Sequence, residues 1–196
     1  MSSKISQALL IEPKSHIRIF DRDFQTELYE KYHTKMISKW CHRICTPVIL
    51  LMLLTMAGFP DTGLIINGTI IAAAGLQLFY LYSYGLMSLV MLPLLVIITS
   101  ISLYLQNTFG MTILPILIVI TLVAVNIQTF SHIVEPVPPP WSGRDSSVPY
   151  NVFIKESSAV KIILVFITTL TVFSILELWA TIRIWPIQIL GLLNQR

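Results

Sequence analysis

Long apolar runs separated by short polar breaks dominate the chain. Each of the four longest runs between residues 44 and 130 is 15 to 20 residues long, and they follow one another with only a few residues between them. A helix that crosses a bilayer needs about 20 predominantly apolar residues, so the runs predict membrane-spanning helices, the first of them short. A fifth span is predicted after a polar break. The five predicted spans are about 44–58, 63–82, 86–105, 111–130 and 159–179.

A different pattern precedes the first span. Apolar side chains recur at every fourth position from Phe24 to Trp40, and Glu27, Lys31 and Lys35 occupy the opposite face. This spacing is typical of an amphipathic helix with one apolar stripe. We therefore predict a juxtamembrane helix over residues 21–41 that lies along the membrane surface.

The remaining segments are connections and ends. The links between the first four spans are so short that antiparallel neighbours in a compact bundle are expected. Pro93 and Pro115 are expected to kink their spans or to mark first turns. Proline-rich residues 131–158 predict a long polar loop. Together these parts predict a single membrane domain over residues 21–186, preceded by a polar arm at 1–20 and followed by a tail at 187–196.

The charges support this division. Only 12% of the 196 residues are charged and 55% are hydrophobic, whereas soluble domains carry about 25% charged residues. Residues 1–45 hold 13 of the 23 charged side chains, and Asp61 is the only one between Thr46 and Val134. This distribution excludes an ordinary soluble enzyme, a nucleic-acid-binding domain and a disordered chain. The predicted fold is all-α, a multi-pass transmembrane bundle of four to five spans.

Basic residues predict the orientation of the bundle. Residues 1–43 contain eight lysines and arginines, and the loop with its flank adds Arg144, Lys155 and Lys161. Short connections on the other side contain none. The positive-inside rule therefore places the N-terminus and the long loop in the cytoplasm.

Three histidines are expected to meet at the cytoplasmic surface. His42 precedes the first span, His132 follows the fourth, and His33 belongs to the predicted surface helix. Because His33 and His42 are nine residues apart, a straight helix would put them on opposite faces, so a bend near Ser38–Lys39 is required. Clustered imidazoles can bind a transition metal, although a histidine at a membrane interface is more often a solvated amphipathic side chain.

Glu177 is a further candidate, because an acidic residue inside an apolar segment is often functional. The alternative is that it reaches the membrane surface or pairs with Arg183. The aromatic residues near the surface are expected to be interfacial anchors rather than a substrate cage. They are Tyr29, Tyr32, Trp40 and Trp141.

The spacing of these residues resembles a known family. Tyr32-His33, then His42, then Pro47 at the head of the first span form one block, and the other comprises Gln128, His132 and Glu135. Both are similar to blocks of the fungal-type 2-hydroxy fatty acid dioxygenases, small multi-pass proteins of the endoplasmic reticulum that also occur in bacteria. Glu177 is similar to an acidic residue of that family's last hydrophobic segment. The chain resembles a divergent member, because Thr34 and Lys35 replace the residues that usually follow the first histidine.

The resemblance implies an Fe(II)-dependent enzyme that shortens 2-hydroxy fatty acids by one carbon in the breakdown of sphingolipid long-chain bases. It implies His33, His42 and His132 as iron ligands, and Glu135 as a catalytic residue that hydrogen-bonds a ligating imidazole or is itself a ligand. Lys39 and Arg43 would bind the substrate carboxylate. The membrane would be the endoplasmic reticulum in a eukaryote or the inner membrane in a bacterium, the partner a lipid substrate, and no nucleic acid is expected.

A second function class stays open from the sequence. The chain can instead be a non-enzymatic membrane scaffold or assembly protein whose basic N-terminal helix and proline-rich loop bind partners or anionic lipid. That function needs no metal. It predicts that histidine substitutions are tolerated and that neutralising Lys31, Lys35 and Lys39 is not.

Overall fold

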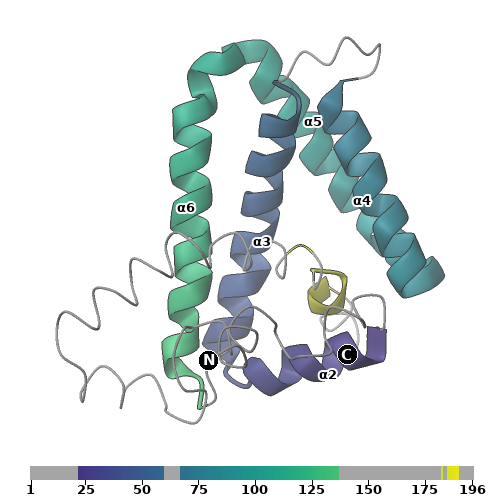
Figure 1. Ribbon diagram of the computed structural model, residues 1–196, viewed down its shortest axis with the longest axis vertical. Coiled ribbons are helices and arrows are strands. Elements are labelled where there is room, and N and C mark those ends of the chain that lie inside the picture. Colours follow the sequence, from purple (N-terminus) through teal and green to yellow (C-terminus); the bar gives the residue numbers. More distant parts are fainter. Residues whose placement is uncertain (1–21, 60–66, 137–181, 183–184, 190–196) are drawn as a thin grey trace, which may run out of the picture.

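A central helix, α3 (Met36–Ala57), organises the computed structural model of the protein, which describes residues 22–59, 67–136, 182 and 185–189 (Figure 1). The other α-helices are α2 (Arg22–Tyr32), α4 (Gly68–Tyr84), α5 (Leu92–Phe109) and α6 (Leu114–Ser131). Three short 3₁₀ helices, η1 (Gly85–Met91), η2 (Gly110–Ile113) and η3 (His132–Val134), connect or end them. No strand occurs in these residues, as the all-α prediction requires.

Two helical stretches are long and apolar enough to cross a membrane. One is α3, and the other is the continuous helical run Gly68–Ser131, which contains α4, α5 and α6. In the most apolar window of the second stretch only 17% of the residues are buried inside the structure. Apolar side chains that face outward at this density need a non-aqueous surrounding, which indicates insertion into a membrane.

The long helical run folds back on itself at two glycines. Gly85 and Gly110 follow α4 and α5 with positive φ angles of 60° and 56°, a region that residues with a Cβ rarely adopt. Pro93 and Pro115 lie in the first turns of α5 and α6, where the missing N–H has no helical partner to lose. They mark first turns, which is one of the two outcomes that the sequence predicted.

The bundle is not a simple series of sequence neighbours. α3 contacts α4, α5 and α6, and α6 packs chiefly against α3 (Figure 1). The short link at Gly110 makes α5 and α6 antiparallel, but they are not the neighbours that the sequence predicted. Their separation lets α3 occupy the centre, where its second and third turns meet the end of α6.

The predicted surface helix over 21–41 is wrong in its extent. The helix ends at Tyr32, the chain is non-helical from His33 to Lys35, and α3 then continues without a break through Ala57. Pro47 therefore lies in the middle of α3 and not in a first turn. Tyr29 and Tyr32 are buried, so they are core residues and not interfacial anchors, whereas Trp40 is 49% exposed.

Helix α2 and residues 185–189 close one end of the bundle. Figure 1 shows α2 lying across the lower end of α3, with the 185–189 segment beside it. Trp185 and Tyr29 belong to one core cluster with Leu50 and Leu54 of α3. The predicted arm 1–20, the fifth span, Glu177 and most of the loop lie outside the described residues.

Candidate metal centre

His33 is fixed by the last turn of α2. Its Nδ1 lies 2.8 Å from the backbone carbonyl of Tyr29, one helical turn earlier, and the two rings stack with centroids 4.2 Å apart. Because a carbonyl only accepts, Nδ1 carries the hydrogen and Nε2 carries the lone pair. This Nε2 is buried and has no hydrogen-bond partner in the described part of the chain. A hydrogen bond of this kind commonly orients a metal-binding histidine.

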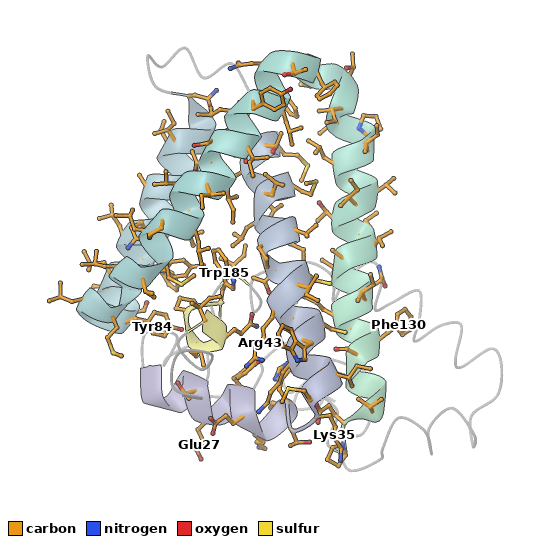
Figure 2. The ribbon with its side chains drawn as sticks, turned by 180° about the vertical axis from the view of Figure 1, so that it is seen from behind. Glu27, Lys35, Arg43, Tyr84, Phe130 and Trp185 are labelled. Atoms are coloured by element: carbon orange, nitrogen blue, oxygen red, sulfur yellow. The ribbon has the colours of Figure 1, made fainter. Side chains whose placement is uncertain are left out.

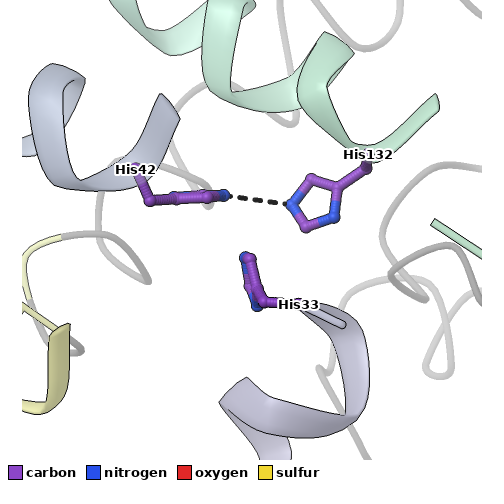
Figure 3. Close-up of side chains that lie close together, drawn as sticks. All are labelled: His33, His42 and His132. Atoms are coloured by element: carbon purple, nitrogen blue, oxygen red, sulfur yellow. Dashed lines mark hydrogen bonds between the residues drawn. The ribbon is translucent and has the colours of Figure 1, made fainter. Parts of the chain in front are cut away.

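His42 and His132 face each other from two antiparallel helices. His42 lies on α3, and His132 opens η3 where α6 ends. Their Nε2 atoms are 3.2 Å apart, although 90 residues separate them in the chain. His33 completes the group, with its ring centroid 4.4 Å from that of His42 and 4.6 Å from that of His132 (Figure 3). The three rings converge on one point.

The distances suit a single metal ion. One ring nitrogen from each histidine lies within 4.8 Å of the other two. Two nitrogens that each bind one ion at about 2.1 Å, at right or tetrahedral angles, are about 3.0–3.4 Å apart. The 3.2 Å between His42 and His132 falls in this range. The group of His33, His42 and His132 can therefore hold a metal ion.

Burial keeps the site in the state that a metal requires. His33, His42 and His132 are 3%, 1% and 1% exposed. Burial lowers the pKa of His33 well below 6.5, and the neighbouring His42 and His132 lower it further. The His33 imidazole is consequently neutral near pH 7, and a neutral imidazole is the form that binds a metal.

The bend that brings His33 to His42 lies at residues 33–35 and not near Ser38–Lys39, as the sequence predicted. Glu135 holds it in place. Its buried carboxylate accepts hydrogen bonds from the backbone N–H groups of Thr34 and Lys35, both at 3.0 Å, and from the Thr34 hydroxyl at 2.6 Å. Lys35 is the N-cap of α3 and its own side chain makes no capping bond, so Glu135 fixes the chain just before the helix begins, at the N–H groups of Thr34 and Lys35.

Glu135 is consequently engaged beside the histidines and not among their ligand atoms. The group that converges in the described residues contains three histidines and no carboxylate. The structure thus gives Glu135 a positioning contact that the sequence did not suggest. Its predicted catalytic function is not tested by this geometry.

The two predicted substrate-binding cations differ in their surroundings. Lys39 is half-buried and close enough for its charge to lower the pKa of His33. Arg43 lies with its guanidinium carbon 5.2 Å from the centre of the Trp40 ring, and its Nε is buried without a hydrogen-bond partner among the described residues. Figure 2 shows the Arg43 side chain directed from α3 toward the 185–189 segment.

A polar layer one turn from the histidines was missed by the sequence analysis. Gln128 donates to the hydroxyl of Thr46 at 3.1 Å, and this hydroxyl donates to Gln188 at 3.4 Å. The three side chains are at most 1% exposed. The available signal was spacing, because Thr46 follows His42 by four residues and Gln128 precedes His132 by four, which puts each on the histidine's face of its helix.

Comparison with protein-family models, curated proteins and solved structures finds no match to the chain. The geometry of the three histidines and the residues around them therefore decide which function the protein can have.

Proposed function

We propose that the protein is an Fe(II)-dependent membrane dioxygenase that converts a 2-hydroxy fatty acid into the fatty acid one carbon shorter. The observation that carries this proposal is the convergence of three buried histidines from α2, α3 and the end of α6. Three imidazoles on one side of an ion leave other positions open for substrate and oxygen, and imidazole is a suitable ligand for Fe(II).

The residues present are compatible with such an ion. The Nε2 of His33 is buried with no partner and its Nδ1 is fixed by Tyr29, so its lone pair has no other function in the described structure. Bound Fe(II) would supply the activation of O₂ that protein side chains alone cannot provide. His33, His42 and His132 would hold the ion, and Glu135 would keep His33 in position through Thr34 and Lys35.

The reaction balances without an external reductant. A 2-hydroxy acid and one O₂ contain the same atoms as the shortened acid, carbon dioxide and water. Breaking the bond between C1 and C2 and oxidising both carbons releases four electrons, which is the number that O₂ takes up when it is reduced fully. An α-hydroxy carboxylate also has two adjacent oxygens that can chelate one metal ion.

The position of the site supports a lipid substrate. We propose that α3, α4, α5 and α6 each cross the bilayer, that the segment 159–179 is a fifth span, and that the N-terminus is cytoplasmic. The histidines lie where α3 begins and α6 ends, at one end of the helices. A fatty acid can then keep its tail in the bilayer while its head group reaches the histidines. The membrane would be the endoplasmic reticulum or a bacterial inner membrane.

The test is metal content and turnover in the same preparation. Protein purified anaerobically in detergent should bind about one Fe(II), and should consume O₂ and release carbon dioxide in equal amounts when given 2-hydroxyhexadecanoate. His42→Ala and His132→Ala should lose iron and turnover but still insert into membranes, whereas His16→Ala should keep both. Wild-type protein that binds no iron after Fe(II) loading would contradict the proposal and favour the scaffold function.

A further inference from the structure

Four buried hydrogen-bond donors of α2, α3 and residues 185–189 have no partner in the described part of the chain. They are the Tyr29 hydroxyl, Arg43 Nε, Trp185 Nε1 and the Gln188 amide nitrogen. The great majority of buried polar groups in proteins are hydrogen-bonded, so four exceptions in one region need an explanation. All four groups can donate, and three of them can only donate.

The four donors come from elements that pack against one another. Arg43, Thr46 and Leu50 follow at helical spacing on one side of α3. Thr46 donates to the oxygen of the Gln188 amide, which leaves the amide nitrogen as the group without a partner. Leu50 shares a core cluster with Trp185 and Tyr29. Figure 2 shows Trp185 and Arg43 on the same side of α3.

The donor set adjoins the candidate metal centre through two of its members. The Tyr29 ring stacks on His33, whose own ring is 4.4 Å from that of His42. Arg43 follows His42 directly in α3. A ligand that contacts the three histidines would therefore lie beside Tyr29 and Arg43, and these two residues lead to Trp185 through the shared core cluster and to Gln188 through Thr46.

The charge of the region favours an anion. Arg43 contacts the Trp40 ring by a cation–π interaction, and within residues 22–59, 67–136, 182 and 185–189 it forms no ion pair with a carboxylate. Glu30 and Glu135 are the acidic residues that act on Tyr29, but Glu30 is exposed and Glu135 already accepts three hydrogen bonds. Donors without acceptors, together with an unpaired guanidinium, bind a carboxylate and repel a second cation.

We infer that Tyr29, Arg43, Trp185 and Gln188 form a carboxylate-binding site beside the three histidines. This inference rests on the proposed function. One carboxylate oxygen and the 2-hydroxyl of the substrate would face the metal ion. The four donors would bind the oxygens of this head group, about two of them at the second carboxylate oxygen, which has two lone pairs. The site accordingly selects free 2-hydroxy acids over their esters and amides, which lack the negative charge.

Equilibrium binding of radiolabelled 2-hydroxyhexadecanoate and its methyl ester tests the inference. The protein is loaded with Fe(II) and kept anaerobic, so that no turnover occurs, and metal content is measured in every sample. Wild-type protein should bind the acid at least about tenfold more tightly than the ester. Arg43→Gln should raise the Kd for the acid about tenfold, leave the Kd for the ester unchanged, and retain the metal. Trp185→Phe and Gln188→Leu should each raise the Kd for the acid by about threefold or more.

Lys31→Gln is the matched control, because it removes an exposed positive charge from α2 outside the donor set. It should bind the acid as the wild type does, and Arg43→Lys should recover part of the affinity that Arg43→Gln loses. Equal binding of acid and ester, or unchanged acid binding in Arg43→Gln with metal present, would overturn the carboxylate site and leave the proposed function intact. Selective acid binding by a wild-type protein that holds no iron would support the donor site and overturn the proposed function.

Discussion

The carboxylate of Glu135 binds the backbone N–H and the hydroxyl of Thr34, 101 residues earlier in the chain. Thr34 follows His33 directly, and Glu135 follows His132 by three residues. A single side chain thus joins the turn that carries one histidine to the turn that carries another. The geometry of the metal centre depends on this contact, because His33 directly follows α2, whose last turn fixes its ring through Tyr29 but not the two residues that lead on to α3.

Replacing Glu135 should weaken metal binding without removing a ligand. Glu135→Ala leaves two backbone N–H groups of the bend without their acceptor, which should reduce the free energy of unfolding by about 1–3 kcal/mol. Metal affinity should fall about 10- to 100-fold, which is the usual effect of removing a residue that orients a metal ligand. Metal titration and thermal unfolding of the detergent-solubilised variant measure both effects.

Glu135→Gln separates this positioning function from a catalytic one. The amide keeps one accepting oxygen, so metal affinity should fall less than in Glu135→Ala, and turnover should decrease in proportion to the bound metal. A Glu135→Gln protein with full metal occupancy and no turnover would instead show that the carboxylate takes part in the reaction.

The metal-free protein should lose stability in mild acid because of His33. Its pKa is lowered in the folded state, chiefly by burial, and returns to about 6.5 on unfolding. Below this pH the unfolded chain takes up a proton that folded His33 does not, so the free energy of unfolding falls with pH, by at most about 1.4 kcal/mol per pH unit for this group. Thermal unfolding with a chelator at pH 5 and 7.5 should show a smaller difference in His33→Asn than in the wild type. An equal difference would contradict the lowered pKa.

The grouping of the three histidines could be predicted from the sequence because the predicted topology puts them at one surface. The four spans predicted between His42 and His132 would place both on one side of the membrane, whatever the helix packing. The contact of Glu135 with Thr34 and Lys35 could not be predicted in this way. It depends on where α2 ends. Apolar residues recur at every fourth position from Phe24 to Trp40, so the pattern continues past the end of α2 and does not mark it.

Which helices pack against one another could not be predicted from the sequence either. Short links predict antiparallel helices but do not decide which faces meet, because apolar side chains surround each helix and the amphipathic signal is lost. Polar residues carry the missing information. Gln106 of α5 donates to the backbone oxygen of Thr55 at 2.8 Å and accepts from Asn67 at 3.1 Å, which fixes α5 against α3 and the start of α4.

Gly110 should be necessary for the fold between α5 and α6. Its backbone has φ 56° and ψ −149°, a conformation that is almost restricted to glycine. Gly110→Ala should therefore reduce the free energy of unfolding by about 1–3 kcal/mol. Gly75→Ala is the control, since Gly75 lies within α4, and a Cβ there would meet nothing within 4 Å. Gly75→Ala should leave the thermal midpoint unchanged or raise it, and an equal loss in both variants would contradict the explanation from φ.

Thr46 should stabilise the end of the bundle through its hydroxyl alone. Thr46→Val keeps the volume of the side chain but removes the acceptor of Gln128 and the donor to Gln188, leaving both buried amides with one partner fewer. We expect a loss of about 1–3 kcal/mol in the free energy of unfolding, and reduced metal affinity because His42 and His132 lie one turn away on the same helices. Thr112→Val is the matched control, because Thr112 is exposed and its hydroxyl donates to the nearby carbonyl of Phe109. Thermal unfolding and metal titration of both variants check this, and equal behaviour of the two would show that the polar layer supports neither the bundle nor the histidines.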